Sequence, residues 1–106
     1  VPVKVGLKKG ITLRAETEKK QEIIDACKRI HDTFKTKGCY NIQLFLTSDN
    51  DVFPIEINPR ISTTFCLGVA AGIDPVSIFH SKEAVNELVP FQSGVTLNRH
   101  WYNYVI

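Results

Sequence analysis

The 106-residue chain contains no methionine, not even at position 1. Its opening residues, Val1 to Val5, alternate apolar and polar in the manner of a strand interior rather than a free terminus. A complete translation product begins with methionine unless it is processed. We therefore expect the sequence to be a piece of a longer polypeptide.

The sequence also has no long apolar run, little net charge and few cysteines. No apolar run approaches the roughly 18 residues that span a bilayer, and no signal peptide opens the chain. The net charge of +2 is too small to predict a nucleic acid or membrane partner. The three cysteines, Cys27, Cys39 and Cys66, are odd in number and widely spaced. This pattern argues against a disulfide framework and predicts reduced thiols in a cytoplasmic protein.

The remaining composition, 43% apolar and 23% charged, is that of an ordinary globular segment of one domain or less. The pattern predicts an α+β fold, with an antiparallel sheet of about four to five strands and helices packed on one face. The expected strands cover residues 1–7, 11–14, 40–58 (a hairpin) and 94–106, and the expected helices cover residues 17–37, 63–71 and 75–88.

The helix over residues 17–37 has the clearest pattern. Thr17 is a plausible N-cap, and Gly38 suits the left-handed position that follows a helix. Apolar residues recur at spacings of four, three and four, which predicts one buried stripe. The stripe consists of Ile23, Cys27, Ile30 and Phe34.

The segment from Tyr40 to Arg60 predicts a β-hairpin around a polar turn from Ser48 to Asp51. With Ser48 opposite Asp51, Gln43 faces Glu56 and Asn41 faces Asn58. Side chains alternate between faces along a strand, so Gln43, Glu56 and Asn58 project from one side. The other side is apolar and predicted to face a core; it consists of Ile42, Leu44, Leu46, Ile55 and Ile57.

A carboxylate and two amide oxygens on one face are oxygen ligands of the kind that Mg²⁺ takes. A site with so little charge is suited to an ion that also binds phosphates. Arg60 is a fixed cation suited to a phosphoryl oxygen, and Pro59 ends the strand before it. The alternative is an ordinary solvent-facing hairpin in which Arg60 pairs with Glu56.

Two motifs carry a resemblance: Asn41-Ile-Gln-Leu-Phe, and Pro54-Ile-Glu-Ile-Asn-Pro-Arg-Ile-Ser followed by Ala70-Ala-Gly72. They resemble the C-terminal, metal-binding half of an ATP-grasp domain, most closely in the carbamoyl-phosphate synthase large chain and related carboxylate–amine ligases. The resemblance covers nearly the whole chain, residues 1–106. It implies that Gln43, Glu56 and Asn58 bind Mg²⁺ or Mn²⁺. It further implies that Arg60 contacts the transferred phosphoryl group and that Asn41 and Ser62 help to bind ATP.

Members of this family activate a carboxylate or bicarbonate as an acyl phosphate, which an amine or ammonia then attacks. The resemblance implies that the partners are the missing N-terminal half of the domain, other domains of the parent chain and a small-molecule substrate. We expect the isolated piece to be inactive. A non-catalytic structural or interaction module with a relict site is the alternative function.

Other residues have simpler interpretations. Lys8, Lys9 and Arg14 fit a solvated basic loop better than a phosphate site. In the alternative interpretation, Ser62 serves only as a helix cap. His80 and Cys66 lack the spacing of a transition-metal site. The aromatic residues from Trp101 onward fit a core strand better than a base-stacking platform.

Overall fold

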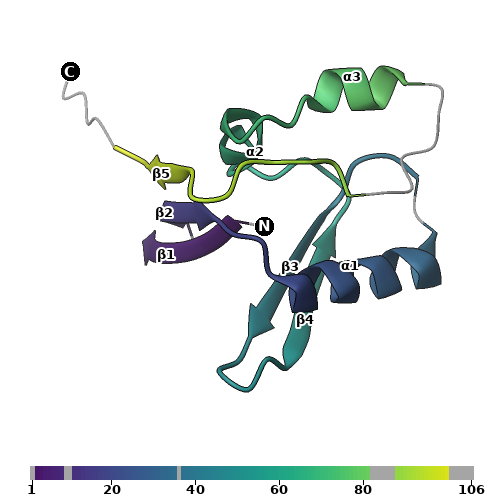
Figure 1. Cartoon of the computed structure of the whole chain (residues 1–106), viewed down its shortest axis with the longest axis horizontal. Helices are drawn as coiled ribbons and strands as arrows, with labels where there is room; N and C mark the ends of the chain where they lie inside the picture. Colours follow the sequence, from purple (N-terminus) through teal and green to yellow (C-terminus); the bar gives the residue numbers. More distant parts are fainter. Residues whose placement is uncertain (1, 9–10, 36, 82–87, 101–106) are drawn as a thin grey trace, which may run out of the picture.

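The computed structural model describes residues 2–8, 11–35, 37–81 and 88–100. In this part of the chain five strands and three helices follow one another in the order β1-β2-α1-β3-β4-α2-α3-β5 (Figure 1). The fold is therefore α+β, as the sequence predicts. The strands do not form one sheet, however: β1, β2 and β5 make a three-stranded sheet, and β3 and β4 make a separate hairpin.

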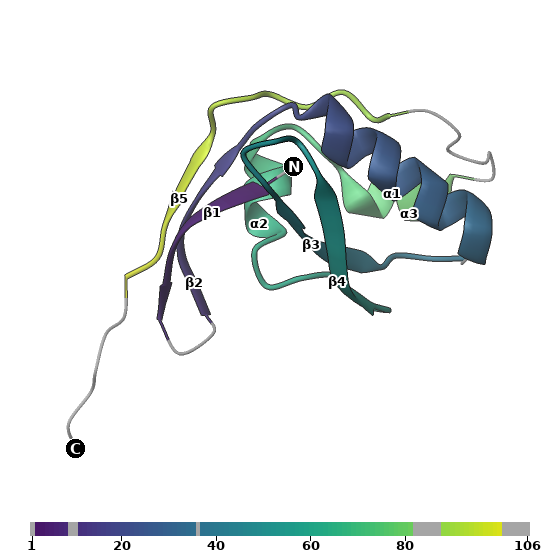
Figure 2. The same cartoon turned by 90° about the horizontal axis from the view of Figure 1, so that it is seen from below.

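In the three-stranded sheet, β2 (Ile11–Thr17) is central and pairs antiparallel with both β1 (Pro2–Lys8) and β5 (Thr96–Asn98). The buried side chains of β2, Thr12, Ala15 and Thr17, are small. Figures 1 and 2 both show the chain between α3 and β5 returning past α2 to reach this sheet. The C-terminal strand thereby joins the first two strands.

Thr17 explains why the first helix starts later than predicted. Its side chain is 3% exposed, donates a hydrogen bond to the Gln92 carbonyl (2.8 Å) and accepts one from the Val95 amide (2.9 Å). Thr17 is therefore the end of β2, tied to the segment that leads into β5, and the prediction that it caps a helix is wrong. Because the Thr17 side chain makes these hydrogen bonds to distant residues, it does not cap α1.

Helix α1 covers Gln21–Phe34, and its N-cap residue, Lys20, makes no side-chain capping bond. Ile23, Ile24 and Ala26 are buried, whereas Phe34 at the end of the predicted stripe is 65% exposed. The helix ends at Phe34 and its C-cap residue, Lys35, has a φ of +48°, so the left-handed turn comes earlier than predicted. Gly38 also has a positive φ, +88°, but in the loop that follows.

The hairpin consists of β3 (Asn41–Leu46) and β4 (Val52–Asn58), and α1 packs against β4. Beyond it, α2 (Cys66–Ala70) packs against β2, and α3 (Pro75–His80) begins after an N-cap residue, Asp74. The Asp74 carboxylate accepts hydrogen bonds from the amides of Val76 and Ser77. The helix ends sooner than predicted, at His80, because Ser81 is already extended.

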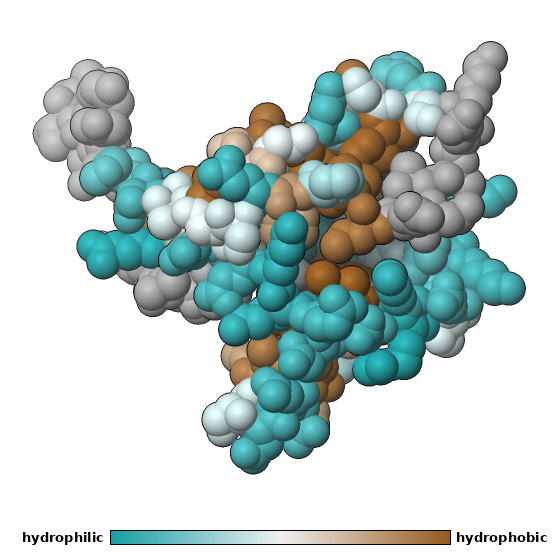
Figure 3. All heavy atoms as spheres, in the orientation of Figure 1, coloured by the Kyte–Doolittle hydropathy of each residue, from teal (hydrophilic) through white to brown (hydrophobic). Residues whose placement is uncertain are grey.

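The core is small. Its buried apolar residues are Ala15, Ile23, Ile24, Ala26, Leu67 and Ala71. Large apolar side chains remain on the surface of α3 and of the hairpin, and Figure 3 shows hydrophobic atoms over both. In the described residues no helix has the length and apolarity that crossing a membrane requires. The predicted aromatic end of the last strand, from Trp101 onward, lies outside the described residues.

Candidate functional site

The hairpin register brings the predicted site residues together. Asn41 pairs with Asn58 and Gln43 with Glu56, as the sequence predicts. Because side chains alternate along a strand, these four share one face. Glu56 and Asn58 are also in direct contact, since the Asn58 Nδ2 donates to the Glu56 Oε1 at 2.9 Å.

The turn that produces this register differs from the predicted one. Thr47, rather than Ser48, lies opposite Asp51: the Thr47 amide donates to the Asp51 carbonyl (2.9 Å), and the Asp51 amide donates to the Thr47 Oγ1 (3.1 Å). Asn50 takes the left-handed conformation inside the loop, with φ +65°. By itself, this turn would shift the pairing of β3 with β4 by one residue relative to the predicted register.

A β-bulge cancels that shift. The ladder passes from Leu44↔Pro54 to Gln43↔Glu56, which leaves Ile55 without a partner. The prediction that the apolar face is covered is wrong for two of its members, because Ile55 at the bulge is 53% exposed and Ile57 is 39% exposed. Pro54 takes the place of Ile55 beside Val52 and lines a cavity against α1.

The donor set fits a hard dication. Glu56 supplies one carboxylate, and Gln43 and Asn58 supply amide oxygens, which are ligands that Mg²⁺ accepts. In the described residues no three His, Cys, Asp or Glu side chains gather into a metal cluster. An ion at this face would therefore depend on amide and phosphate oxygens in addition to Glu56.

Arg60 follows the strand as an exposed side chain. Its amide donates to the Asn58 carbonyl (2.8 Å), and its Nη1 donates to the Ile61 carbonyl (3.3 Å). It does not pair with Glu56, since Glu18–Lys20 is the single salt bridge among the described residues. The guanidinium therefore keeps most of its donors for a ligand.

Ser62 caps a turn rather than the helix itself. Its Oγ accepts a hydrogen bond from the Thr64 amide (3.2 Å) and contacts the Thr64 Oγ1 (2.8 Å). The regular helix begins only at Cys66. The loop between Arg60 and α2 is also held by Arg99, whose Nη2 donates to the Thr63 carbonyl (3.2 Å).

Arg99 and two other features escaped the sequence analysis. One is His31, which is exposed, but its Nδ1 lies 2.6 Å from the Tyr40 hydroxyl and the two rings stack. Partial burial, followed by the negative charges of Cys27 and Asp32, raises the pKa of Tyr40. This contact fastens the end of α1 to the residue before Asn41.

The second feature is an exposed aromatic pair. Phe45 and Phe53 are cross-strand partners, 67% and 56% exposed. Phe45 follows Gln43 by two residues, so the pair continues the face of the polar site. Alternation along the sequence does not predict this pair, because the bulge decides which face of the hairpin Phe53 occupies.

The three cysteines are free thiols, with Cys39 and Cys66 exposed and Cys27 half-buried. Burial raises the pKa of Cys27. Among the described residues, neither Cys66 nor His80 belongs to a group of three His, Cys, Asp or Glu side chains that could hold a metal ion.

Comparison with known proteins gives one positive result. The model of the family described as "ATP-grasp in the biosynthetic pathway with Ter operon" matches residues 3–100. No curated protein and no solved structure matches the chain. The match covers nearly all of the sequence, including both hairpin strands, Arg60 and β5. The chain thus belongs to this ATP-grasp family.

Proposed function

We propose that the chain supplies the metal- and phosphate-binding half of an ATP-dependent carboxylate–amine ligase of the carbamoyl-phosphate synthase-like type. The observation that carries the proposal is the hairpin face. Gln43, Glu56 and Asn58 converge there, and Arg60 extends from the end of the same strand. Membership of an ATP-grasp family supports ATP as the nucleotide.

Each residue has a distinct task in this proposal. Glu56, Asn58 and Gln43 would hold Mg²⁺ or Mn²⁺, which when bound neutralises phosphate charge and acts as a Lewis acid. Asn41 and Ser62 would offer polar groups to the nucleotide. Phe45 and Phe53 would offer an apolar π-surface on the same face, suited to a base.

Arg60 acts on the transferred group. A substrate carboxylate oxygen forms a bond to the γ-phosphorus, while the bond from this phosphorus to the bridging oxygen breaks and ADP leaves. Charge on the γ-phosphoryl oxygens is held by the planar guanidinium during the transfer. An amine nitrogen then bonds to the acyl carbon, phosphate leaves with the carbon–oxygen bonding electrons, and the nitrogen loses a proton.

The proposed partners are a second half of the ATP-grasp domain and a small-molecule substrate. Exposed apolar side chains outside the proposed site, Phe34 of α1 with Ile55 and Ile57 of the hairpin, support a partner surface that would cover them. Free thiols support a reducing, cytoplasmic location.

An isotope experiment tests the reaction. The full-length protein is incubated with ATP, Mg²⁺, an amine and a carboxylate labelled with ¹⁸O. We expect one labelled oxygen in the inorganic phosphate, because an acyl phosphate leaves with an oxygen of the carboxylate. Release of pyrophosphate with the label in AMP would instead show adenylation and contradict the proposal.

A further inference from the structure

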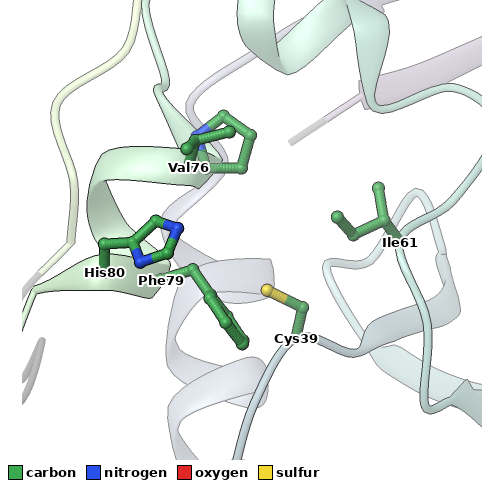
Figure 4. Close-up of a pocket in the computed structure, with 6 residues that line it drawn as sticks. Cys39, Ile61, Val76, Phe79 and His80 are labelled. Carbon is green, nitrogen blue, oxygen red and sulfur yellow. The ribbon is translucent and has the colours of Figure 1, made fainter.

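A pocket of about 190 Å³ lies between α3 and the two loops that flank the hairpin (Figure 4). Its walls come from three separate segments: Cys39 before β3, Ile61 after β4, and Pro75, Val76, Phe79 and His80 of α3. In Figure 4 the thiol of Cys39 points into the space bounded by Ile61, Val76 and Phe79. None of these residues belongs to the hairpin face described above.

The pocket is suited to a hydrocarbon group. Ile61, Pro75, Val76 and Phe79 are apolar, and Val76 and Phe79 are 64% and 69% exposed. The pocket is open to solvent on one side, and its volume has room for a group of about one ring, since an enclosed cavity of about 150 Å³ in another protein holds benzene. Covering these side chains with such a group would remove apolar surface from water.

The pocket lies next to Arg60, so its ligand is also expected to carry a negative charge. Ile61 directly follows Arg60, and the guanidinium is held near it by the bond from Nη1 to the Ile61 carbonyl (3.3 Å). A ligand with a hydrocarbon end in the pocket can therefore place an anionic end at a fixed cation. Planar carboxylate oxygens match the geometry of guanidinium donors.

We propose that this pocket binds the hydrocarbon part of the substrate acid, while Arg60 meets its carboxylate. This inference rests on the proposed function and deepens it, because it selects the substrate class. The substrate is a carboxylic acid with an apolar group of about one ring, rather than bicarbonate. Bicarbonate has no group that could fill the pocket.

Cys39 provides a readout that does not depend on turnover. The full-length protein is pulse-labelled with iodoacetamide, and the labelling of individual cysteine peptides is followed by mass spectrometry. Phenylacetate is the probe, with acetate and bicarbonate as small anions. We expect saturating phenylacetate to slow labelling of Cys39 at least fivefold, while acetate and bicarbonate leave it unchanged. Cys66, which is also exposed but lies outside the pocket, is the internal control.

Two variants separate the hydrocarbon and charge contributions. Phe79→Ser removes an exposed wall of the pocket and should abolish protection of Cys39 by phenylacetate. Arg60→Gln should weaken protection by phenylacetate to the level given by neutral phenylacetamide, which has the same shape. Equal protection of Cys66, equal effects of bicarbonate and phenylacetate, or an unchanged phenylacetate preference in Arg60→Gln would each overturn the inference.

The labelling of Cys39 tests the pocket, whereas ¹⁸O transfer tests the proposed reaction. The two proposals can therefore fail independently. Transfer from some acid without protection of Cys39 by phenylacetate would refute the pocket assignment alone. Protection of Cys39 together with adenylation chemistry would refute the proposed reaction and leave the binding site in place.

Discussion

At the scale of single residues, Glu56 is the one carboxylate in the proposed metal site, and its neighbours there are neutral amides. The Glu56→Gln variant keeps the shape of the side chain but removes a negative charge beside the dication. If the protein is the proposed ligase, its kcat should fall at least about a hundredfold, the scale on which loss of one transition-state electrostatic contact is felt. Steady-state kinetics across a Mg²⁺ titration measure this effect.

Gln43→Glu is the matched variant for that experiment. It lies directly opposite Glu56 and adds a charge instead of removing one. Its effect on kcat should be milder, with activity reached at lower Mg²⁺ concentration. If Glu56→Gln behaves like the parent at every Mg²⁺ concentration, the hairpin face is structural and the site assignment is wrong.

Asp74 gives a second prediction at this scale. Hydrogen bonds from the Ser77 side chain, then from backbone amides, lower the pKa of this carboxyl group below its ordinary 3.8. The charged form is therefore favoured in the folded state, and its stabilising effect is complete above the unfolded pKa. It is lost as the pH falls through the folded pKa.

Unfolding by urea at pH values from 6 down to 2.5 measures this loss. Asp74→Asn keeps a capping side chain but cannot titrate, so its stability should fall less steeply below about pH 4 than that of the parent. Identical pH profiles for the two proteins would show that the capping charge has no effect on folding.

At the scale of elements, the hairpin was predictable in outline because polar and apolar residues alternate along both strands. The loop closure and the bulge were not, since each depends on backbone conformation at single residues such as Asn50 and Ile55. The two one-residue shifts cancel, so the predicted pairing of Gln43 with Glu56 is confirmed although the predicted turn is wrong. The start of α1 was mispredicted because Thr17 bonds to residues more than seventy positions away.

Disulfide cross-linking tests the hairpin register. In a background with Cys27, Cys39 and Cys66 changed to serine, cysteines at positions 43 and 56 should form a disulfide readily on mild oxidation. Directly paired residues of antiparallel strands have Cα atoms about 4.5–5.5 Å apart, within disulfide range.

The control pair places cysteines at positions 43 and 55. These positions are one residue out of register in the bulged ladder, so they should cross-link more slowly than the 43/56 pair. Preferential cross-linking of the 43/55 pair would mean that the bulge is absent and that Glu56 leaves the site face.

At the scale of the whole molecule, the chain is open. Its radius of gyration is 15.0 Å, against about 13 Å expected for a compact domain of this length. The three-stranded sheet and the hairpin are separate, and Phe45, Phe53, Val76 and Phe79 are largely exposed. The sequence could not predict this division, because strand propensity does not specify which strands pair.

The open architecture predicts that the 106-residue chain does not hydrolyse ATP alone. Excluding water and orienting the phosphates requires the nucleotide to be enclosed, whereas Glu56 on the hairpin face is exposed and its neighbours Gln43 and Asn58 are only half-buried. Phosphate release by the purified chain at increasing protein concentration measures this. Robust Mg²⁺-dependent turnover would reveal a self-sufficient site or a dimer that encloses the nucleotide.

The central claim is that one face of the hairpin binds the metal–nucleotide complex. Paramagnetic broadening by Mn²⁺ tests it most directly, because amide NMR signals within reach of the ion disappear first. With ATP and substoichiometric Mn²⁺, the full-length protein should lose the signals of Gln43, Glu56 and Asn58 before those of α1 or β2, and Glu56→Gln should retain them. Broadening that begins elsewhere, or that is unchanged in Glu56→Gln, would contradict the account.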